Sequence, residues 1–183
     1  MRSDEHLVAS YQNSGQREAI DELTERHLGA VQAMVYTMVL DKTVAEDLTQ
    51  EVFLRAFRGL AAFDGRSRFS TWLYRVTMNT THGFLARQRR SPLDFRAEVP
   101  DGCQSASEHP EAAVMQGELE SAIEAALRDL PPKLRAAIVL VSIEKMEVKE
   151  AARIEGCTRA TMYWRLHEAR KRLKQCLKGH LLP

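Results

Sequence analysis

The apolar residues of this chain recur at helical spacing in both halves, and one segment between them breaks the pattern. Residues 91–111 (SPLDFRAEVPDGCQSASEHPE) carry three prolines and show no sustained periodicity. No segment alternates apolar and polar residues for long enough to predict a strand. The sequence therefore predicts an all-α protein: two small helical domains, residues 1–92 and 113–183, joined by a flexible acidic linker, residues 93–112.

The composition restricts the class of protein further. The 183 residues are 44% hydrophobic and 28% charged, which is typical of a globular chain in water. The longest apolar run, residues 136–141, is far too short to span a membrane, and the N-terminus lacks the apolar stretch of a secretory signal. We therefore expect a cytoplasmic protein with no membrane insertion. Three cysteines without a CxxC pair predict neither a disulfide framework nor a zinc site.

The formal net charge of +1 conceals strongly charged blocks. Residues 1–51 hold four Lys or Arg against ten Asp or Glu, whereas residues 65–93 hold six Arg and no acid. Residues 158–183 hold seven Lys or Arg against a single Glu. For either basic block alone, a solvated helix face is the simpler interpretation. Two such blocks, separated by an acidic segment, indicate two places where a polyanion docks.

The first domain is expected to contain four helices, one beginning at Leu7 and others over about 16–39, 44–60 and 71–90. Thr43 is the expected N-cap of the third helix, with Glu46 completing a capping box, and Ser70 is the expected cap of the fourth. One face of the fourth helix carries residues that recur at spacings of three, four and three: Trp72, Arg75, Asn79 and His82. An indole, a guanidinium, an amide and an imidazole in one stripe suit nucleic acid through stacking, phosphate neutralisation and base-edge hydrogen bonds.

The second domain is expected to contain a helix-turn-helix. Helices are expected over about 114–130 and 133–145, and a short helix over 148–155 should break at Gly156. Thr158 is then the expected cap of a longer basic helix, whose inward stripe is Met162, Leu166, Ala169, Leu173 and Leu177. Its outward or flanking residues are mostly basic or aromatic: Arg159, Thr161, Tyr163, Trp164, Arg165, His167 and Lys171.

Two motifs resemble a known family. DLTQEVFLRAFRGL (47–60), followed by FSTWLYRVTMNT (69–80), resembles the core of the extracytoplasmic-function (ECF) group of bacterial sigma factors in the sigma-70 family. LRDLPPKLRAAIVLV (127–141) and the helix-turn-helix after it resemble that family's second domain. The resemblance implies a promoter-specificity subunit of RNA polymerase, active in a stress or signal response and restrained by an anti-sigma factor.

The resemblance also implies three binding regions. Contacts with core RNA polymerase would involve its β′ clamp and β flap, and the residues matching the clamp contact are Asp47, Gln50, Glu51 and Leu54. The −10 element of promoter DNA would be melted and captured by the loop FDGRSRF (63–69) and the helix after it, through Phe63, Gly65, Arg66, Arg68, Trp72, Arg75, Asn79 and His82. The −35 element would be read in the major groove by the outward residues of the helix over 159–172. Within that helix Tyr163 and Trp164 stand where the family usually has basic and hydroxyl groups.

Two other functions remain as alternatives. A helix-turn-helix regulator that binds duplex DNA without polymerase would have no reason for the Trp72–Asn79 stripe beside an acid-free block. A helical metal-dependent phosphohydrolase would need an adjacent His-Asp pair, yet none of the six histidines is followed by Asp. The chain also lacks a Gly-rich phosphate loop and a GxSxG motif. We therefore expect no catalytic residue, no metal and no cofactor.

Overall fold

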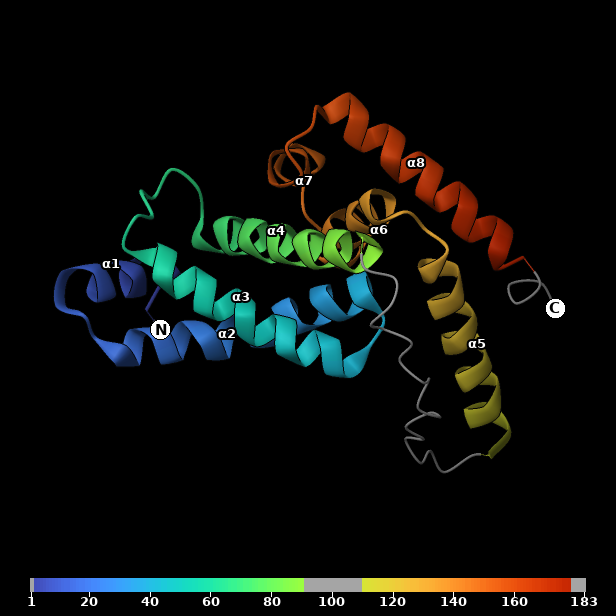
Figure 1. Cartoon of the computed structure of the whole chain (residues 1–183), viewed down its shortest axis with the longest axis horizontal. Helices are drawn as coiled ribbons and strands as arrows, with labels where there is room; N and C mark the ends of the chain where they lie inside the picture. Colours follow the sequence, from blue (N-terminus) through green and yellow to red (C-terminus); the bar gives the residue numbers. More distant parts are fainter. Residues whose placement is uncertain (1, 91–109, 179–183) are drawn as a thin grey trace.

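The computed structural model describes residues 2–90 and 110–178, and every regular element in these residues is a helix (Figure 1). In chain order the elements are α1 (Asp4–Ser14), α2 (Arg17–Val39), α3 (Lys42–Leu60), α4 (Phe69–Arg90), α5 (Pro110–Arg128), α6 (Pro132–Ile138), the π-helical turn η1 (Val139–Ile143), α7 (Val148–Ile154) and α8 (Arg159–Cys176). The all-helical expectation is thus confirmed. Among the described residues, no helix combines the length and the apolar content that crossing a membrane requires.

Helix starts follow the caps, and two expected caps are wrong. Asp41 caps α3 instead of Thr43: its backbone is extended, and its carboxylate accepts a hydrogen bond from Val44 N at 2.9 Å. Thr43 already lies inside the first turn, so it cannot cap. Ser70 likewise lies inside α4, because that helix begins at Phe69. Thr158 does cap α8, accepting from Thr161 N at 3.1 Å.

The first four helices pack around one core. α2 packs against α1, α3 and α4, and α3 also packs against α4 (Figure 1). The periodicity placed the buried face of α3 correctly, since Leu48, Val52 and Ala56 are all buried. Thr77 of α4 is fully buried as well, and its hydroxyl donates to Leu73 O at 3.0 Å, so no polar group is left unpaired there.

In the second half, α6 and α7 both pack against α8, and α7, a tight turn and α8 form the expected helix-turn-helix. Gly156 stands in the turn with φ of 59°, a left-handed conformation that glycine adopts without steric cost. The inward stripe of α8 is buried at Met162, Leu166 and Ala169. The prediction of a single helix over 133–145 is wrong. This segment forms α6 followed by η1, whose wider turn is closed by a hydrogen bond from Glu144 N to Val139 O at 2.9 Å.

The two halves pack against each other. Met34, Met38 and Met78 from the first half belong to the same buried cluster as Leu130 and Leu134 from the second. Arg135, itself buried, donates to Met38 O at 2.5 Å, to the carbonyl of Arg128, the last residue of α5, and to the carbonyl of Leu130. The expected linker, residues 93–112, lies outside the described residues except for its end, which forms the first turn of α5.

Candidate nucleic-acid and polymerase interfaces

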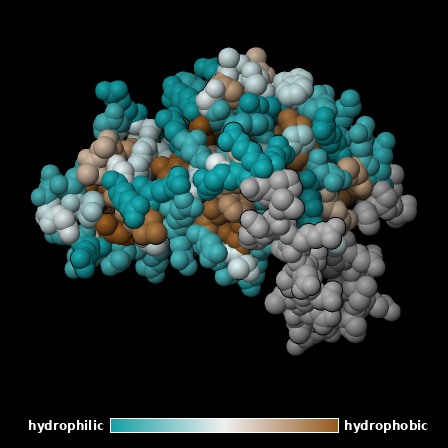
Figure 2. Space-filling view, viewed as in Figure 1, coloured by the Kyte–Doolittle hydropathy of each residue, from teal (hydrophilic) through white to brown (hydrophobic). Residues whose placement is uncertain are grey.

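The outward face of α3 carries the residues expected to contact polymerase. Asp47, Gln50 and Leu54 are exposed, and Leu54 is the most exposed large apolar side chain of this helix at 57%. Glu51 is half-buried and accepts hydrogen bonds from Arg55 at 2.9 and 2.5 Å. In the view of Figure 2, hydrophobic side chains gather in the region that α3 occupies in Figure 1, with hydrophilic ones around them. A single exposed leucine would be unremarkable, but apolar side chains that gather within a polar rim mark contact sites for protein partners.

Residues 61–68 connect α3 to α4 and form an exposed, basic loop. Gly65 stands at its tip with φ of 69°, and Arg66 and Arg68 are both exposed. Asp64 shapes the tip, because its carboxylate accepts from Arg66 N at 3.2 Å and pairs with the Arg66 side chain at 2.9 Å. The arginine side chains of this loop are therefore available to a phosphate backbone.

An aromatic floor lies beneath this loop. Phe63 is buried, and its ring centroid lies 6.2 Å from that of Phe69 and 5.3 Å from that of Trp72. Trp72 is half-buried, and Gly59 gives it room: a Cβ at Gly59 would lie 3.4 Å from the indole. Phe63 thus supports the loop from inside and presents no face to a ligand in this structure.

The stripe of four residues on α4, Trp72 to His82, is only partly accessible to a ligand. Arg75 and Asn79 are exposed on one side of the helix, with Trp72 at its start. His82 is only 18% exposed, and its Nε2 lies 2.9 Å from Glu155 Oε1 at the end of α7. Arg75 also reaches α7, donating to Arg153 O at 3.4 Å. In this conformation α7 therefore lies against the stripe that the sequence assigned to DNA.

On α8 the expected DNA-binding residues divide in the same way. Tyr163 and Trp164 are each 61% exposed, an unusual degree for such large rings. Arg159, His167 and Lys171 are exposed beside them. Thr161 and Arg165 instead contact residues of this chain. The Thr161 hydroxyl lies 2.9 Å from the Thr158 hydroxyl, and Arg165, 15% exposed, donates to Glu155 Oε2 at 3.2 Å.

Glu155 is the residue that sequence reasoning missed. Its side chain is 1% exposed, and it pairs with His82 of α4, with Lys133 of α6 at 3.2 Å and with Arg165 of α8. Burial by itself would raise the pKa of this carboxyl, but the hydrogen bond with His82 and the charge of Lys133 outweigh burial, and the pKa lies below its ordinary value. One carboxylate thus holds a candidate −10 residue and a candidate −35 residue together.

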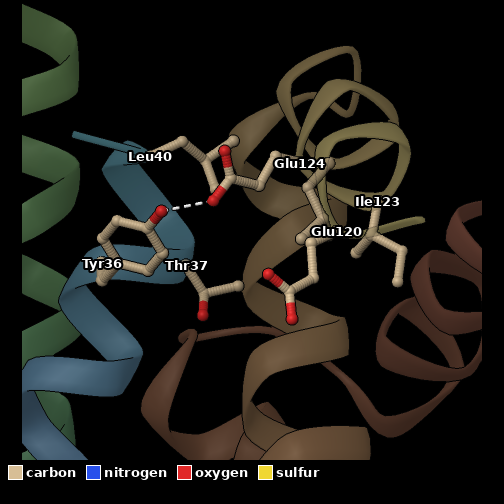
Figure 3. A pocket seen from close by; sticks show the side chains of 7 residues that line it. Tyr36, Thr37, Leu40, Glu120, Ile123 and Glu124 are labelled. Carbon is tan, nitrogen blue, oxygen red and sulfur yellow. Dashed lines mark hydrogen bonds between the residues drawn. The ribbon is translucent and has the colours of Figure 1, made fainter. Parts of the chain in front are cut away.

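A groove between α2 and α5 marks a second contact of the two halves (Figure 3). Its lining residues are Tyr36, Thr37, Leu40, Glu120, Ile123, Glu124 and Leu127. The Tyr36 hydroxyl donates to the Glu124 carboxylate across the groove, and this bond, with burial, raises the pKa of Tyr36 to about 12. In the part of the chain that the structure describes, no group of three His, Cys, Asp or Glu side chains is placed to hold a metal ion. The exposed residues of α3, of the loop with α4, and of α8 thus form separate surfaces that are suited to binding.

Solved structures of known proteins share this fold. The structure of CnrH in complex with the cytosolic domain of CnrY superposes with a TM-score of 0.71, at 24% identity over 97% of this chain and 99% of that chain. The structure of the sigma factor RpoE with the anti-sigma factor NepR from Bartonella quintana gives a TM-score of 0.68, at 23% identity over 86% of this chain and 96% of that chain. The fold is therefore a two-domain helical one with a helix-turn-helix in its second half.

Sequence comparison gives the family. The model of sigma-70 region 2 matches residues 23–91, and that of sigma-70 region 4 matches residues 120–173. The chain is 30% identical to the RNA polymerase sigma-H factor of Pseudomonas aeruginosa over 96% of this chain and 94% of the relative. It is 31% identical to the ECF RNA polymerase sigma-E factor of Escherichia coli over 92% and 91%. The chain belongs to the ECF group of sigma-70 family RNA polymerase sigma factors.

Proposed function

We propose that this chain binds core RNA polymerase and directs it to promoters, with the first domain opening the −10 element and the second reading the −35 element. The observation that carries this proposal is the division of the surface. The outward face of α3, the basic loop with the stripe on α4, and the outward face of α8 lie on different elements, so one chain can provide separate contacts for a protein and for two DNA segments. The relatives are polymerase sigma factors over nearly their whole length, which favours this function over a regulator that binds DNA without polymerase.

We assign the −10 element to Arg66, Arg68, Trp72, Arg75 and Asn79, with Phe63 supporting the loop from below and Gly65 forming its tip. His82 joins them once α7 moves away from α4. Strand capture needs phosphate neutralisation and a surface for unstacked bases, and an arginine loop above a half-buried indole supplies both.

The remaining assignments follow from the partners. RpoE was solved with an anti-sigma factor and CnrH with the cytosolic domain of CnrY, and we propose that an anti-sigma factor likewise restrains this chain. Because core polymerase and promoter DNA are the proposed partners, we propose that the chain acts in the bacterial cytoplasm. Binding alone accomplishes the proposed task, so we assign the chain no catalytic activity, metal or cofactor of its own.

The polymerase contact is tested by changing Asp47, Gln50 and Glu51 together to alanine. In reconstituted run-off transcription the unchanged chain should direct specific initiation by core polymerase, and the triple variant should lose it. Its affinity for core polymerase should fall about tenfold or more, as removal of central contact residues does. Stability should change by about 1 kcal/mol or less, since Asp47 and Gln50 are exposed and the Glu51–Arg55 pair contributes only about 0.3–0.5 kcal/mol.

The matched control changes Asp21, Glu25 and Gln32 of α2, which have the same three residue types and are all exposed. This control should bind polymerase as the unchanged chain does. Equal affinities of the two triple variants for core polymerase would place the contact elsewhere. If the unchanged chain does not direct specific initiation by core polymerase, the proposed function itself is contradicted.

The −35 contact is tested on α8 by comparing two kinds of change. Lys171→Ala should weaken binding of the polymerase complex to all promoters and lower the salt slope by about one, because it removes a phosphate contact. Trp164→Ala with His167→Ala should instead relax discrimination between −35 sequences by about 1–3 kcal/mol. Titrations of promoter binding at several salt concentrations measure the first effect, and competition between promoters with intact and substituted −35 elements measures the second. Unchanged −35 preference in the Trp164 and His167 double variant would move recognition to other residues.

A further inference from the structure

One side chain of α1 bonds to the start of the basic loop that connects α3 to α4, residues 61–68. Gln12 Nε2 donates to Leu60 O and to Phe63 O, each at 2.9 Å. Leu60 is the last residue of α3, and Phe63 begins the sequence FDGRSRF. Because both partners are carbonyls, which only accept, the amide NH₂ must face them. A single amide thus bridges two carbonyls three residues apart and fixes the path by which the chain leaves α3.

α1 also reaches the other end of the loop, through α2. Asp4 accepts from His27 Nε2 at 2.8 Å and from Arg26 at 2.8 Å. The His27 ring packs edge-on to Phe69, the first residue of α4, with centroids 5.4 Å apart. Leu7 and Val8 are buried and hold α1 in place. Both ends of the loop are therefore positioned with respect to α1.

Between these two anchors the loop has little support of its own. Residues 64–68 are all exposed, and the described contacts of this stretch are the turn made by Asp64 with Arg66 and the bond from Trp72 N to Arg68 O. The conformation of such a segment is therefore restricted mainly by its anchored ends, because ordering each free residue has an entropic cost.

We propose that Gln12 is a positioning residue for promoter opening: through its two bonds to Leu60 O and Phe63 O, α1 holds the loop over the aromatic floor in the geometry that accepts an unstacked base. The proposal rests on the proposed function. It adds that opening depends on a residue outside the loop and the stripe, on a helix that lies before the matched sigma-70 region 2. Gln12 itself touches no DNA in this arrangement; it acts through the backbone of the loop.

The test compares three variants in the full chain with core polymerase. Gln12→Met keeps the length of the side chain and removes the donors, whereas Gln12→Lys keeps donors at a similar reach. Asn13→Ala removes the neighbouring exposed amide and is the control. Open complexes are measured by permanganate reactivity of thymines on a matched duplex and on a template mismatched across the −10 element. Hydrogen exchange of residues 61–68 is measured in the free chain.

We expect Gln12→Met to slow opening of the matched duplex about tenfold, to leave the mismatched template within about twofold, and to speed exchange in the loop, because loss of two hydrogen bonds loosens its start. Gln12→Lys should recover most of the loss, and polymerase affinity should be unchanged. A merely structural role would lower polymerase binding and activity on both templates together.

Each other outcome overturns the inference. Equal opening by Gln12→Met and Asn13→Ala, an equal loss on both templates, or no recovery with Gln12→Lys would each remove Gln12 from the positioning of the loop while the proposed function stands. Failure of the unchanged chain to open a promoter with polymerase would instead contradict the proposed function, so the two failures are distinguishable.

Discussion

Asn79→Ala is expected to reduce opening of a matched promoter duplex strongly while polymerase still binds. Extruding a base costs a few kcal/mol, which only stacking and hydrogen bonds to the freed base can offset. Asn79 is exposed two turns beyond Trp72 on the same face of α4, and its amide offers both a donor and an acceptor. Loss of such a pair is worth about 1–3 kcal/mol, so open complexes should fall about 5- to 150-fold.

The measurement separates opening from folding. Alanine at an exposed helix position should not destabilise α4, since alanine has the higher helix propensity. Activity should partly recover on a template already mismatched across the −10 element, where the opening cost has been removed beforehand. Replacing Gly65–Arg68 with a neutral sequence should give the same division between the two templates, because Arg66 and Arg68 are the exposed cations of the loop.

Gln88→Ala is the matched control for Asn79. Gln88 is an exposed amide on the same helix, and nine residues at 100° each place it on the opposite side of α4. Permanganate reactivity should be unchanged in this variant. If Asn79→Ala opens the matched duplex as well as the unchanged chain does, the stripe has a structural role only.

The features that the sequence predicted correctly are those set by helical periodicity and by helix capping. The buried face of α3, the inward stripe of α8 and the turn at Gly156 each depend on neighbours within a few residues, so periodicity and capping rules locate them. The cap of α3 was misplaced because Asp41 and Thr43 are both good capping residues two positions apart. Local rules do not decide between them.

Contacts between distant segments could not be predicted in this way. Phe63 lies in a loop by sequence, but Phe69 and Trp72 bury its ring, and only the return of α4 beneath the loop shows this. His82 and Arg165 belong to different domains and look equally exposed on helical wheels. They meet at Glu155, 73 residues from one and 10 from the other. A single glutamate before a turn glycine carries no periodic signal.

Glu155→Gln should destabilise the packed form by about 2–4 kcal/mol, because removing the charge leaves cationic side chains around a buried site without their partner. Arg165 is 15% exposed and would lose its counter-charge, whereas Lys133, 54% exposed, would be solvated and contribute little. Since Glu155 joins α4, α6, α7 and α8, the loss should weaken the packing of α7 against α4 in particular. Glu150→Gln is the control, because Glu150 lies in α7, the helix that Glu155 follows, and forms no ion pair with any described residue.

The stability that Glu155 contributes should depend on pH in a definite direction. The pKa of Glu155 lies below its ordinary value in the folded chain, so the unfolded chain binds this proton more readily. The stabilisation is therefore fully present above the ordinary pKa of 4.5 and is lost as the pH falls through the lower pKa of the folded state. Urea unfolding between pH 7 and pH 3 should show a smaller acid-induced loss in Glu155→Gln than in the unchanged chain or in Glu150→Gln. Identical acid profiles of all three would mean that the charge of Glu155 does not hold the two halves together.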